Sequence, residues 1–196
     1  RGPAFSVSSA CASANHAIAQ AAILIRSGMV DIAISGGTDA PFTYGLLKAW
    51  EAIRVLSTDA CRPFSIDRDG MVLGEGAGMV ILESMEHAKS RGARIYAELA
   101  GLGMSADAAH ITDPSSDGAA RAMRYALADA RAKPEQITYI NAHGTGTIQN
   151  DPSETKAIRQ VFGGHADDLL VSSTKAMHGH VLGASGAIEL IATVLS

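Results

Sequence analysis

Cys11 and the segment after it constrain the fold of this chain more than any other feature. A short β-like segment precedes the cysteine, and residues 12–25 are almost all small or apolar, with no Gly or Pro before Gly28. This pattern predicts a strand, a tight turn and a buried helix, with the thiol at the helix N-terminus. Free N–H groups and the positive end of the helix dipole favour the thiolate there. From this segment alone, an unreactive buried cysteine is an equally good interpretation, because free Cys packs well as a small hydrophobe.

The composition is that of a globular chain with a sizeable core. Of 196 residues, 47% are hydrophobic and 18% charged, and the net charge of −4 argues against a nucleic-acid-binding surface. Two cysteines, Cys11 and Cys61, suit neither a disulfide framework nor a thiolate metal cage, so we expect a reducing, cytoplasmic compartment. We expect no transmembrane segment, since Ser185 and Glu189 interrupt the best candidate stretch, residues 181–195.

The ends of the sequence predict a piece of a longer protein. The chain starts with Arg-Gly-Pro, without an initiator Met or a signal-peptide pattern, and it stops inside an apolar helical pattern at residues 191–196. Half of a continuous sheet would expose strand edges and apolar faces. We therefore expect such a piece, taken alone, to aggregate.

Strand-like and helical patterns alternate along the chain, which predicts an α/β architecture with a largely buried sheet. The expected strands are residues 31–37, 79–82, 95–103, 137–140 and 169–172. The expected helices are residues 42–54, 84–90, 117–132 and 153–162, with a last helix from Gly186 onward.

Three further polar side chains stand where strands are expected to end. His143 follows one strand and precedes a Gly-Thr-Gly-Thr loop, Lys175 follows another, and His180 stands just before a Gly/Ala-rich helix start. Ligands gather at the carboxyl ends of strands in open α/β sheets. The helix start favours a neutral imidazole at His180, whose Nε2 can then donate or accept a hydrogen bond. A cysteine at a helix start together with two such histidines predicts a reactive site.

A metal centre is not expected from these residues. His143, His178 and His180 could bind zinc on paper, but no carboxylate or further ligand has the required spacing.

Together, these motifs resemble those of the β-ketoacyl synthases, the condensing enzymes of fatty-acid and polyketide assembly. The matching segments occur in family order and are residues 10–13, 36–37, 62–70, 73–78, 141–147 and 173–187. The resemblance implies a partial thiolase-like five-layer αβαβα fold. Residues 1–92 would be the end of the N-terminal half, carrying the nucleophile, and residues 93–196 a truncated C-terminal half, carrying the histidines. A missing Gly-Phe-Gly-Gly type loop would complete the oxyanion hole.

The resemblance also implies roles for individual residues. Cys11 matches the acyl-accepting nucleophile, and His143 and His180 match the two histidines of the elongating Cys-His-His group. Lys175 matches the family lysine, and Glu189 matches the acidic residue that orients it.

Other positions match substrate and carrier contacts. Thr145 and Thr147 match hydroxyls that contact the pantetheine arm. Arg54 matches a surface arginine that can meet an acidic carrier protein, with a solvated charge as the alternative. His178 stands where housekeeping elongation synthases commonly carry Thr, and in this respect the chain resembles nodulation-protein-E-like and related specialised synthases.

The implied activity is a decarboxylative Claisen condensation. Cys11 takes the acyl group from a carrier thioester, and its N–H, with the missing loop, stabilises the oxyanion. His143 and His180 then stabilise the enolate formed when malonyl-carrier loses CO₂, and the carbanion attacks the Cys11 thioester. The implied partners are the acyl carrier protein, malonyl- and acyl-thioester substrates and a second copy in a homodimer. No cofactor or metal is implied, because the phosphopantetheine arm belongs to the carrier, and we expect the piece alone to be inactive.

Two other functions remain open from the sequence. One is a thiolase-like acyltransferase that uses coenzyme A thioesters. The other is a degenerate ketosynthase that serves as a partner of the chain-length-factor type, although such partners lack the nucleophile and Cys11 is present.

Overall fold

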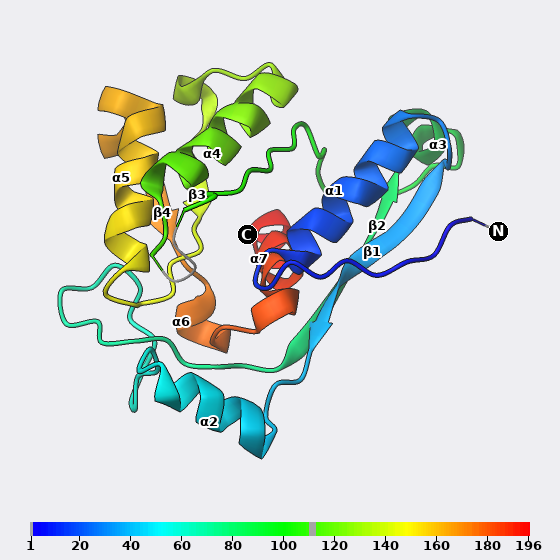
Figure 1. Cartoon of the computed structure of the whole chain (residues 1–196). Helices are drawn as coiled ribbons and strands as arrows, with labels where there is room; N and C mark the ends of the chain where they lie inside the picture. Colours follow the sequence, from blue (N-terminus) through cyan, green and yellow to red (C-terminus); the bar gives the residue numbers. More distant parts are fainter. Residues whose placement is uncertain (1, 110–112) are drawn as a thin grey trace. The chain divides into compact units, whose positions relative to one another are not determined.

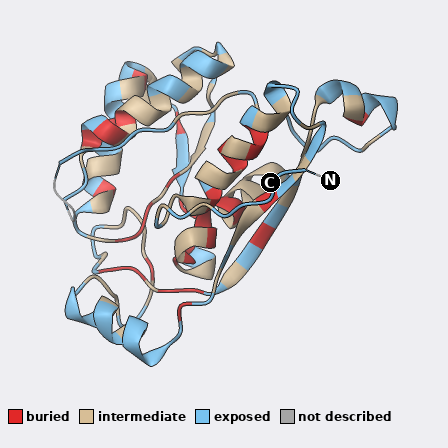
Figure 2. Ribbon diagram, turned by 45° about the vertical axis from the view of Figure 1, so that its right-hand side comes forward, coloured by how far each residue is buried: buried red, intermediate tan, exposed pale blue. Residues whose placement is uncertain are grey.

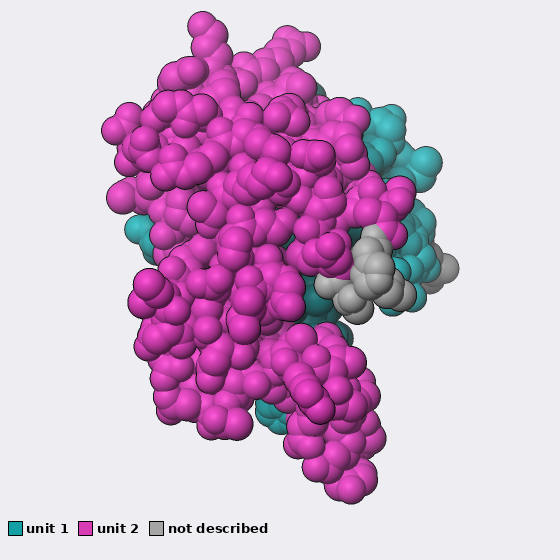
Figure 3. Space-filling view, turned by 60° about the vertical axis from the view of Figure 1, so that its left-hand side comes forward, with its two compact units in different colours: residues 1–43, 73–98, 180–196 teal, residues 44–72, 99–179 magenta. Residues whose placement is uncertain are grey.

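The computed structural model describes residues 2–109 and 113–196, which form two compact units. The first unit contains residues 1–43, 73–98 and 180–196, and the second contains residues 44–72 and 99–179 (Figure 3). Each unit is therefore assembled from segments that are far apart in the sequence. Among the described residues, no helix is both long and apolar enough to cross a membrane.

The first unit is built on an antiparallel strand pair. Strands β1 (Ile32–Asp39) and β2 (Gly76–Glu83) pair along eight residues each, with Ile34 opposite Ile81 and Gly37 opposite Gly78. Its helices are α1 (Ser13–Arg26), α3 (Met85–Ser90) and α7 (Ser185–Leu195), with the short turn η3 (Leu182–Ala184) before α7 (Figure 1).

Helices α1 and α7 pack against the same face of this strand pair. The opposed Gly37 and Gly78 permit the close approach: a Cβ at Gly37 would lie 2.9 Å from the Ala14 Cβ of α1, and one at Gly78 would lie 3.0 Å from the Ala187 carbonyl carbon of α7. Both alanines are buried, and Figure 2 colours the ribbon by burial. This packing fixes the N-terminus of α1 against the start of α7.

The opposite face of the strand pair is apolar and exposed. Its side chains alternate with those that face the helices, and Ile34 is 73% and Ile81 63% exposed. The predicted strands at 31–37 and 79–82 are confirmed, but their prediction as buried strands is wrong for this chain. The reason is that helices of the unit cover only one of the two faces.

The second unit surrounds a short parallel strand pair. Strands β3 (Tyr139–Asn141) and β4 (Leu170–Ser172) pair in parallel, and helices α4 (Ser116–Ala130) and α5 (Asn150–Phe162) pack on each other. The core consists of Ile158, Phe162 and Leu169, with partly buried Met123, Leu127, Ile137, Ile140, Val161 and Ala166 around it.

The remaining elements of the second unit are short. Helix α6 (Lys175–His178) follows β4, and the turns η1 (Pro134–Gln136) and η2 (Gly163–Asp167) flank β3 and α5. Helix α2 (Tyr44–Ala52) has no buried residue.

Two predicted strands are absent from the described residues. Residues 95–103 form no strand, because Gly101 and Gly103 pack against α4 and the Leu102 N–H donates to the Asp129 carboxylate at 2.8 Å instead of to a neighbouring strand. The segment before Cys11 forms only an isolated bridge between Ser9 and Cys11.

Candidate active site

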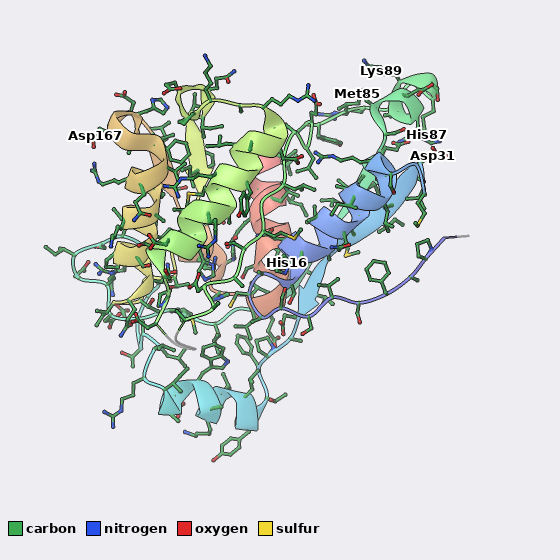
Figure 4. All side chains as sticks on the ribbon, turned by 45° about the horizontal axis from the view of Figure 1, so that its top comes forward. His16, Asp31, Met85, His87, Lys89 and Asp167 are labelled. Carbon is green, nitrogen blue, oxygen red and sulfur yellow. The ribbon has the colours of Figure 1, made fainter. Side chains whose placement is uncertain are left out.

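A tight turn presents Cys11 two residues before the first residue of α1. Ala10 has a left-handed backbone with φ of 51°, which is uncommon for a residue with a Cβ. The Ser13 hydroxyl holds the turn, since it accepts the Ser9 N–H at 2.9 Å and donates to the Ala10 carbonyl at 2.6 Å. His16, labelled in Figure 4, adds a contact from α1, because its Nδ1 lies 2.6 Å from the Ser9 hydroxyl. This turn therefore holds the half-buried thiol at the helix N-terminus.

His180 lies in contact with Cys11 in the first unit. Its Nε2 is 3.0 Å from the Cys11 Sγ, and the residue is only 2% exposed. The backbone on either side is anchored: the Gly74 N–H donates to the His180 carbonyl at 3.0 Å, and the Gly183 N–H donates to the Asp39 carboxylate at 2.9 Å.

The hydrogen bonds at His180 define its tautomer. The Leu182 N–H can only donate, and it lies 3.1 Å from the His180 Nδ1, with the Ser185 hydroxyl at 3.0 Å from the same atom. The Ser185 oxygen itself accepts the Val181 N–H at 2.9 Å. In neutral His180 the proton is therefore on Nε2, the nitrogen that faces Cys11, where it can donate to a thiolate or to a substrate oxygen.

His143 and Lys175 lie together in the second unit. They follow the parallel neighbours β3 and β4, and the Lys175 Nζ is 3.3 Å from the His143 Nδ1. Lys175 is fully buried. Because an ammonium only donates, the His143 Nδ1 accepts, and neutral His143 also carries its proton on Nε2.

Glu154 on α5 completes this arrangement, and sequence reasoning missed it. Its carboxylate accepts the His143 N–H at 2.7 Å, the Gly144 N–H at 2.8 Å and the Asn150 amide at 3.3 Å. Burial raises the pKa of Glu154, although these hydrogen bonds and the Lys175 charge oppose the shift. No local sequence pattern marks this contact, because the His143 and Gly144 N–H groups lie 11 and 10 residues before Glu154 in the chain.

Asp151 is a second carboxylate that sequence reasoning missed. It is 2% exposed and accepts the Phe64 N–H at 2.7 Å and the Gly146 N–H at 3.2 Å, with the Arg68 Nε at 3.9 Å. It thereby connects the Gly-Thr-Gly-Thr loop to residues 62–70, two segments that both resemble ketosynthase motifs.

Thr145 and Thr147 lie within this loop. Their hydroxyl oxygens are 2.9 Å apart, Thr145 is only 5% exposed, and Thr147 Oγ1 accepts the Asn150 N–H at 3.2 Å. The Thr145 carbonyl accepts a hydrogen bond from the buried Cys61 thiol at 3.4 Å.

The two weaker assignments lie on other elements. Arg54 is exposed just after α2 and has a left-handed backbone with φ of 56°. Glu189 is half-buried on α7 and belongs to the first unit, whereas Lys175 belongs to the second.

The comparisons with known proteins assign the family. Residues 1–88 match the model of the β-ketoacyl synthase N-terminal domain, and residues 96–196 match that of the C-terminal domain. The chain belongs to the β-ketoacyl synthase family. It is 59% identical to Nodulation protein E of Rhizobium sp. (strain N33) and 47% identical to 3-oxoacyl-[acyl-carrier-protein] synthase 2 of Staphylococcus aureus, in each case over 100% of this chain.

A solved relative confirms the fold. The type II PKS ketosynthase of AntDE:AntF, solved in complex with its acyl-carrier protein, is 42% identical with a TM-score of 0.96 over 99% of this chain. The predicted thiolase-like fold, present in part, is thereby confirmed. The chain spans 49% of Nodulation protein E and 50% of the staphylococcal synthase and of the AntDE:AntF ketosynthase, so it covers about half the length of these relatives.

Proposed function

We propose that the full-length protein is an elongating 3-oxoacyl-[acyl-carrier-protein] synthase that condenses malonyl-carrier with an acyl group held on Cys11. The observation that carries this proposal is the 3.0 Å contact between the Cys11 Sγ and the His180 Nε2 at the N-terminus of α1. The similarity of the chain to a 3-oxoacyl-[acyl-carrier-protein] synthase and to a ketosynthase solved with its carrier protein supports the same activity.

In the first step, Cys11 takes the acyl group. The thiolate attacks the acyl thioester carbonyl, and collapse of the tetrahedral intermediate breaks the bond to the carrier sulfur, which leaves as the carrier thiol after taking a proton. The helix N-terminus favours the attacking anion, and the Cys11 N–H is our candidate donor to the oxyanion.

In the second step, malonyl-carrier loses CO₂. The electron pair of the broken C–C bond becomes an enolate, whose oxygen accepts hydrogen bonds from the Nε2 protons of His143 and His180. Lys175 supports this role of His143, because its donation to Nδ1 keeps the proton on Nε2. The enolate carbon then attacks the Cys11 thioester and expels the thiolate. Glu189 acts as the acidic partner of the lysine, as the family resemblance implies.

The proposal includes the partners of the reaction. The carrier's phosphopantetheine arm would contact Thr145 and Thr147, and the acidic carrier would meet Arg54 at the surface. A homodimer in the cytoplasm, with no metal or other cofactor, completes the proposal, as the family resemblance implies.

Intact-protein mass spectrometry of the full-length protein tests the acyl-enzyme step. We expect one adduct from a labelled acyl-carrier thioester, or from cerulenin, on the wild type and none on Cys11→Ala. Cys61→Ala is the matched control and should keep the adduct, because burial raises the pKa of the Cys61 thiol and leaves it protonated. Failure of both reagents to label Cys11 would show that it is not the nucleophile.

The same experiment separates the two other functions. A degenerate partner would give no adduct on Cys11. The contact between Cys11 and His180 argues against this function. A thiolase-like enzyme would turn over coenzyme A thioesters in place of malonyl-carrier. Equal Cys11 adducts from an acyl-carrier thioester and from an acyl-coenzyme A thioester, with no CO₂ released from malonyl-carrier, would favour that enzyme.

A further inference from the structure

Helix α6 is a single turn that carries Lys175 and is followed closely by His180. Lys175 is the first residue of α6, which is labelled in Figure 1, and His180 lies two residues beyond its last residue, His178. One helical turn gains few backbone hydrogen bonds for the residues it orders, so it has little stability of its own. The position of Lys175 and the path of the chain into His180 therefore need support from side chains.

The imidazole of His178 supplies such support. Its Nδ1 lies 2.7 Å from the Gly179 carbonyl oxygen, and its Nε2 lies 3.0 Å from the Thr174 hydroxyl. A carbonyl only accepts, so the proton is on Nδ1, and in the neutral ring Nε2 accepts from the Thr174 hydroxyl. One ring thus joins the residue before α6 to the residue after it.

The Gly179 contact acts on the peptide that leads into His180. Gly179 has φ of 72° and ψ of −175°, a conformation that glycine adopts readily and other residues rarely. The Gly179 N–H already donates to the Lys175 carbonyl at 2.9 Å, and the His178 contact holds the other side of the residue, its carbonyl. The bond from His178 fixes the direction of the Gly179 carbonyl and, with it, the plane of the peptide that continues into His180.

We propose that His178 is a positioning residue of the condensation reaction, one that holds the α6 turn and thereby orients Lys175 and the chain entering His180. The inference rests on the proposed function. His178 does not itself touch the reacting atoms.

The test uses His178 variants of the full-length protein in a malonyl-carrier decarboxylation assay. His178→Ala should lower kcat about tenfold, because a small misplacement of catalytic groups is costly, and should leave KM within about twofold. His178→Asn should restore most of kcat, because its amide N–H takes the place of the Nδ1–H toward Gly179. His178→Gln should restore less, because its amide mimics Nε2. Met177→Ala is the control, since Met177 is the adjacent residue on α6 and is 88% exposed.

A second variant tests the contact between the His178 Nε2 and the Thr174 hydroxyl. Thr174→Val removes one hydroxyl and should lower kcat less than His178→Ala does. Combined with His178→Ala it should add little further loss, because both changes break one connection. Thermal melts establish that each variant is folded. If His178→Ala does not fold, the kcat of Thr174→Val alone tests the inference.

The outcomes distinguish this inference from the proposed function. A folded wild type that releases no CO₂ from malonyl-carrier would overturn the proposed function. An active wild type with unchanged His178→Ala and Thr174→Val variants would overturn the inference alone. A loss in His178→Ala that raises KM in parallel and is not restored by Asn would also overturn it.

Discussion

The two units hold their candidate catalytic groups by different means. In the first unit, the left-handed Ala10, the Ser13 hydroxyl and the Leu182 N–H lie directly at Cys11 and His180, and the Asp39 carboxylate holds the backbone only at Gly183. In the second unit, buried charges hold His143, because Lys175 contacts its ring and Glu154 accepts its backbone N–H. The difference indicates that changes of shape should impair the first unit most, whereas changes of charge should impair the second.

Replacing each histidine in turn should give the largest effect. His143→Ala and His180→Ala should each lower malonyl decarboxylation about 10²-fold to 10³-fold, because each removes one donor to the enolate oxygen. Both should leave some Cys11 acylation, and His180→Ala should slow acylation more, since the His180 Nε2 contacts the Cys11 Sγ. Stopped-flow CO₂ release and mass spectrometry measure the two steps. Equal loss of both steps in both variants would contradict the division of labour.

Replacing the Glu154 carboxylate should destabilise the second unit, because two backbone N–H groups depend on its two oxygens. Glu154→Gln leaves one of two backbone N–H groups without an acceptor, so we expect the free energy of unfolding to fall by about 1–3 kcal/mol in urea titrations.

The same variant has a defined pH dependence. Burial raises the pKa of Glu154 above 4.5, so its ionisation opposes folding. The stability advantage of the wild type over Glu154→Gln should therefore shrink as the pH rises through the folded-state pKa. An advantage that grows with pH would contradict the direction of this shift.

Filling the space at Gly37 should break the first unit by shape alone. Gly37→Ala places a Cβ 2.9 Å from both the Ala14 Cβ and the Gly183 carbonyl oxygen, so we expect about 1–3 kcal/mol of destabilisation and slower acylation of Cys11. Gly45→Ala in α2 is the control, since no atom lies within 4 Å of its added Cβ. Equal stability of the two variants would show that α1 is not held by this close approach.

The smallest expected effect concerns acid stability of the first unit. Hydrogen bonds from Arg91 and His87 lower the pKa of Glu83 from 4.5 to about 2 (His87 is labelled in Figure 4). A lowered pKa gives stability that is present above pH 4.5 and is lost as the pH falls toward 2. Urea midpoints should fall through this window in the wild type and stay nearly level in Glu83→Gln.

Local patterns in the sequence were enough to predict much of the fold and the site. Helices α1, α4, α5 and α7 lie close to their expected positions, because each has a continuous apolar pattern with clear ends. The motifs around Cys11, His143 and His180 were visible because each lies within a few consecutive residues.

Features that depend on distant segments could not be predicted. Glu154 and Asp151 act on the loop 144–147 and on residues 62–70, and no local pattern announces those contacts. Residues 95–103 have a strand-like pattern, yet two glycines pack that segment on α4 instead. The prediction that β1 and β2 are buried strands was also wrong, because burial depends on what covers the face that carries Ile34 and Ile81.

A single-turnover experiment on the full-length protein tests the central claim most directly. Protein carrying a labelled acyl group on Cys11 is mixed with malonyl-carrier, and both the label and CO₂ are followed. The account predicts that the label moves from Cys11 to a 3-oxoacyl-carrier product, with one CO₂ released for each label transferred. Label that stays on Cys11, or leaves as a free acid, while malonyl-carrier is decarboxylated would contradict it.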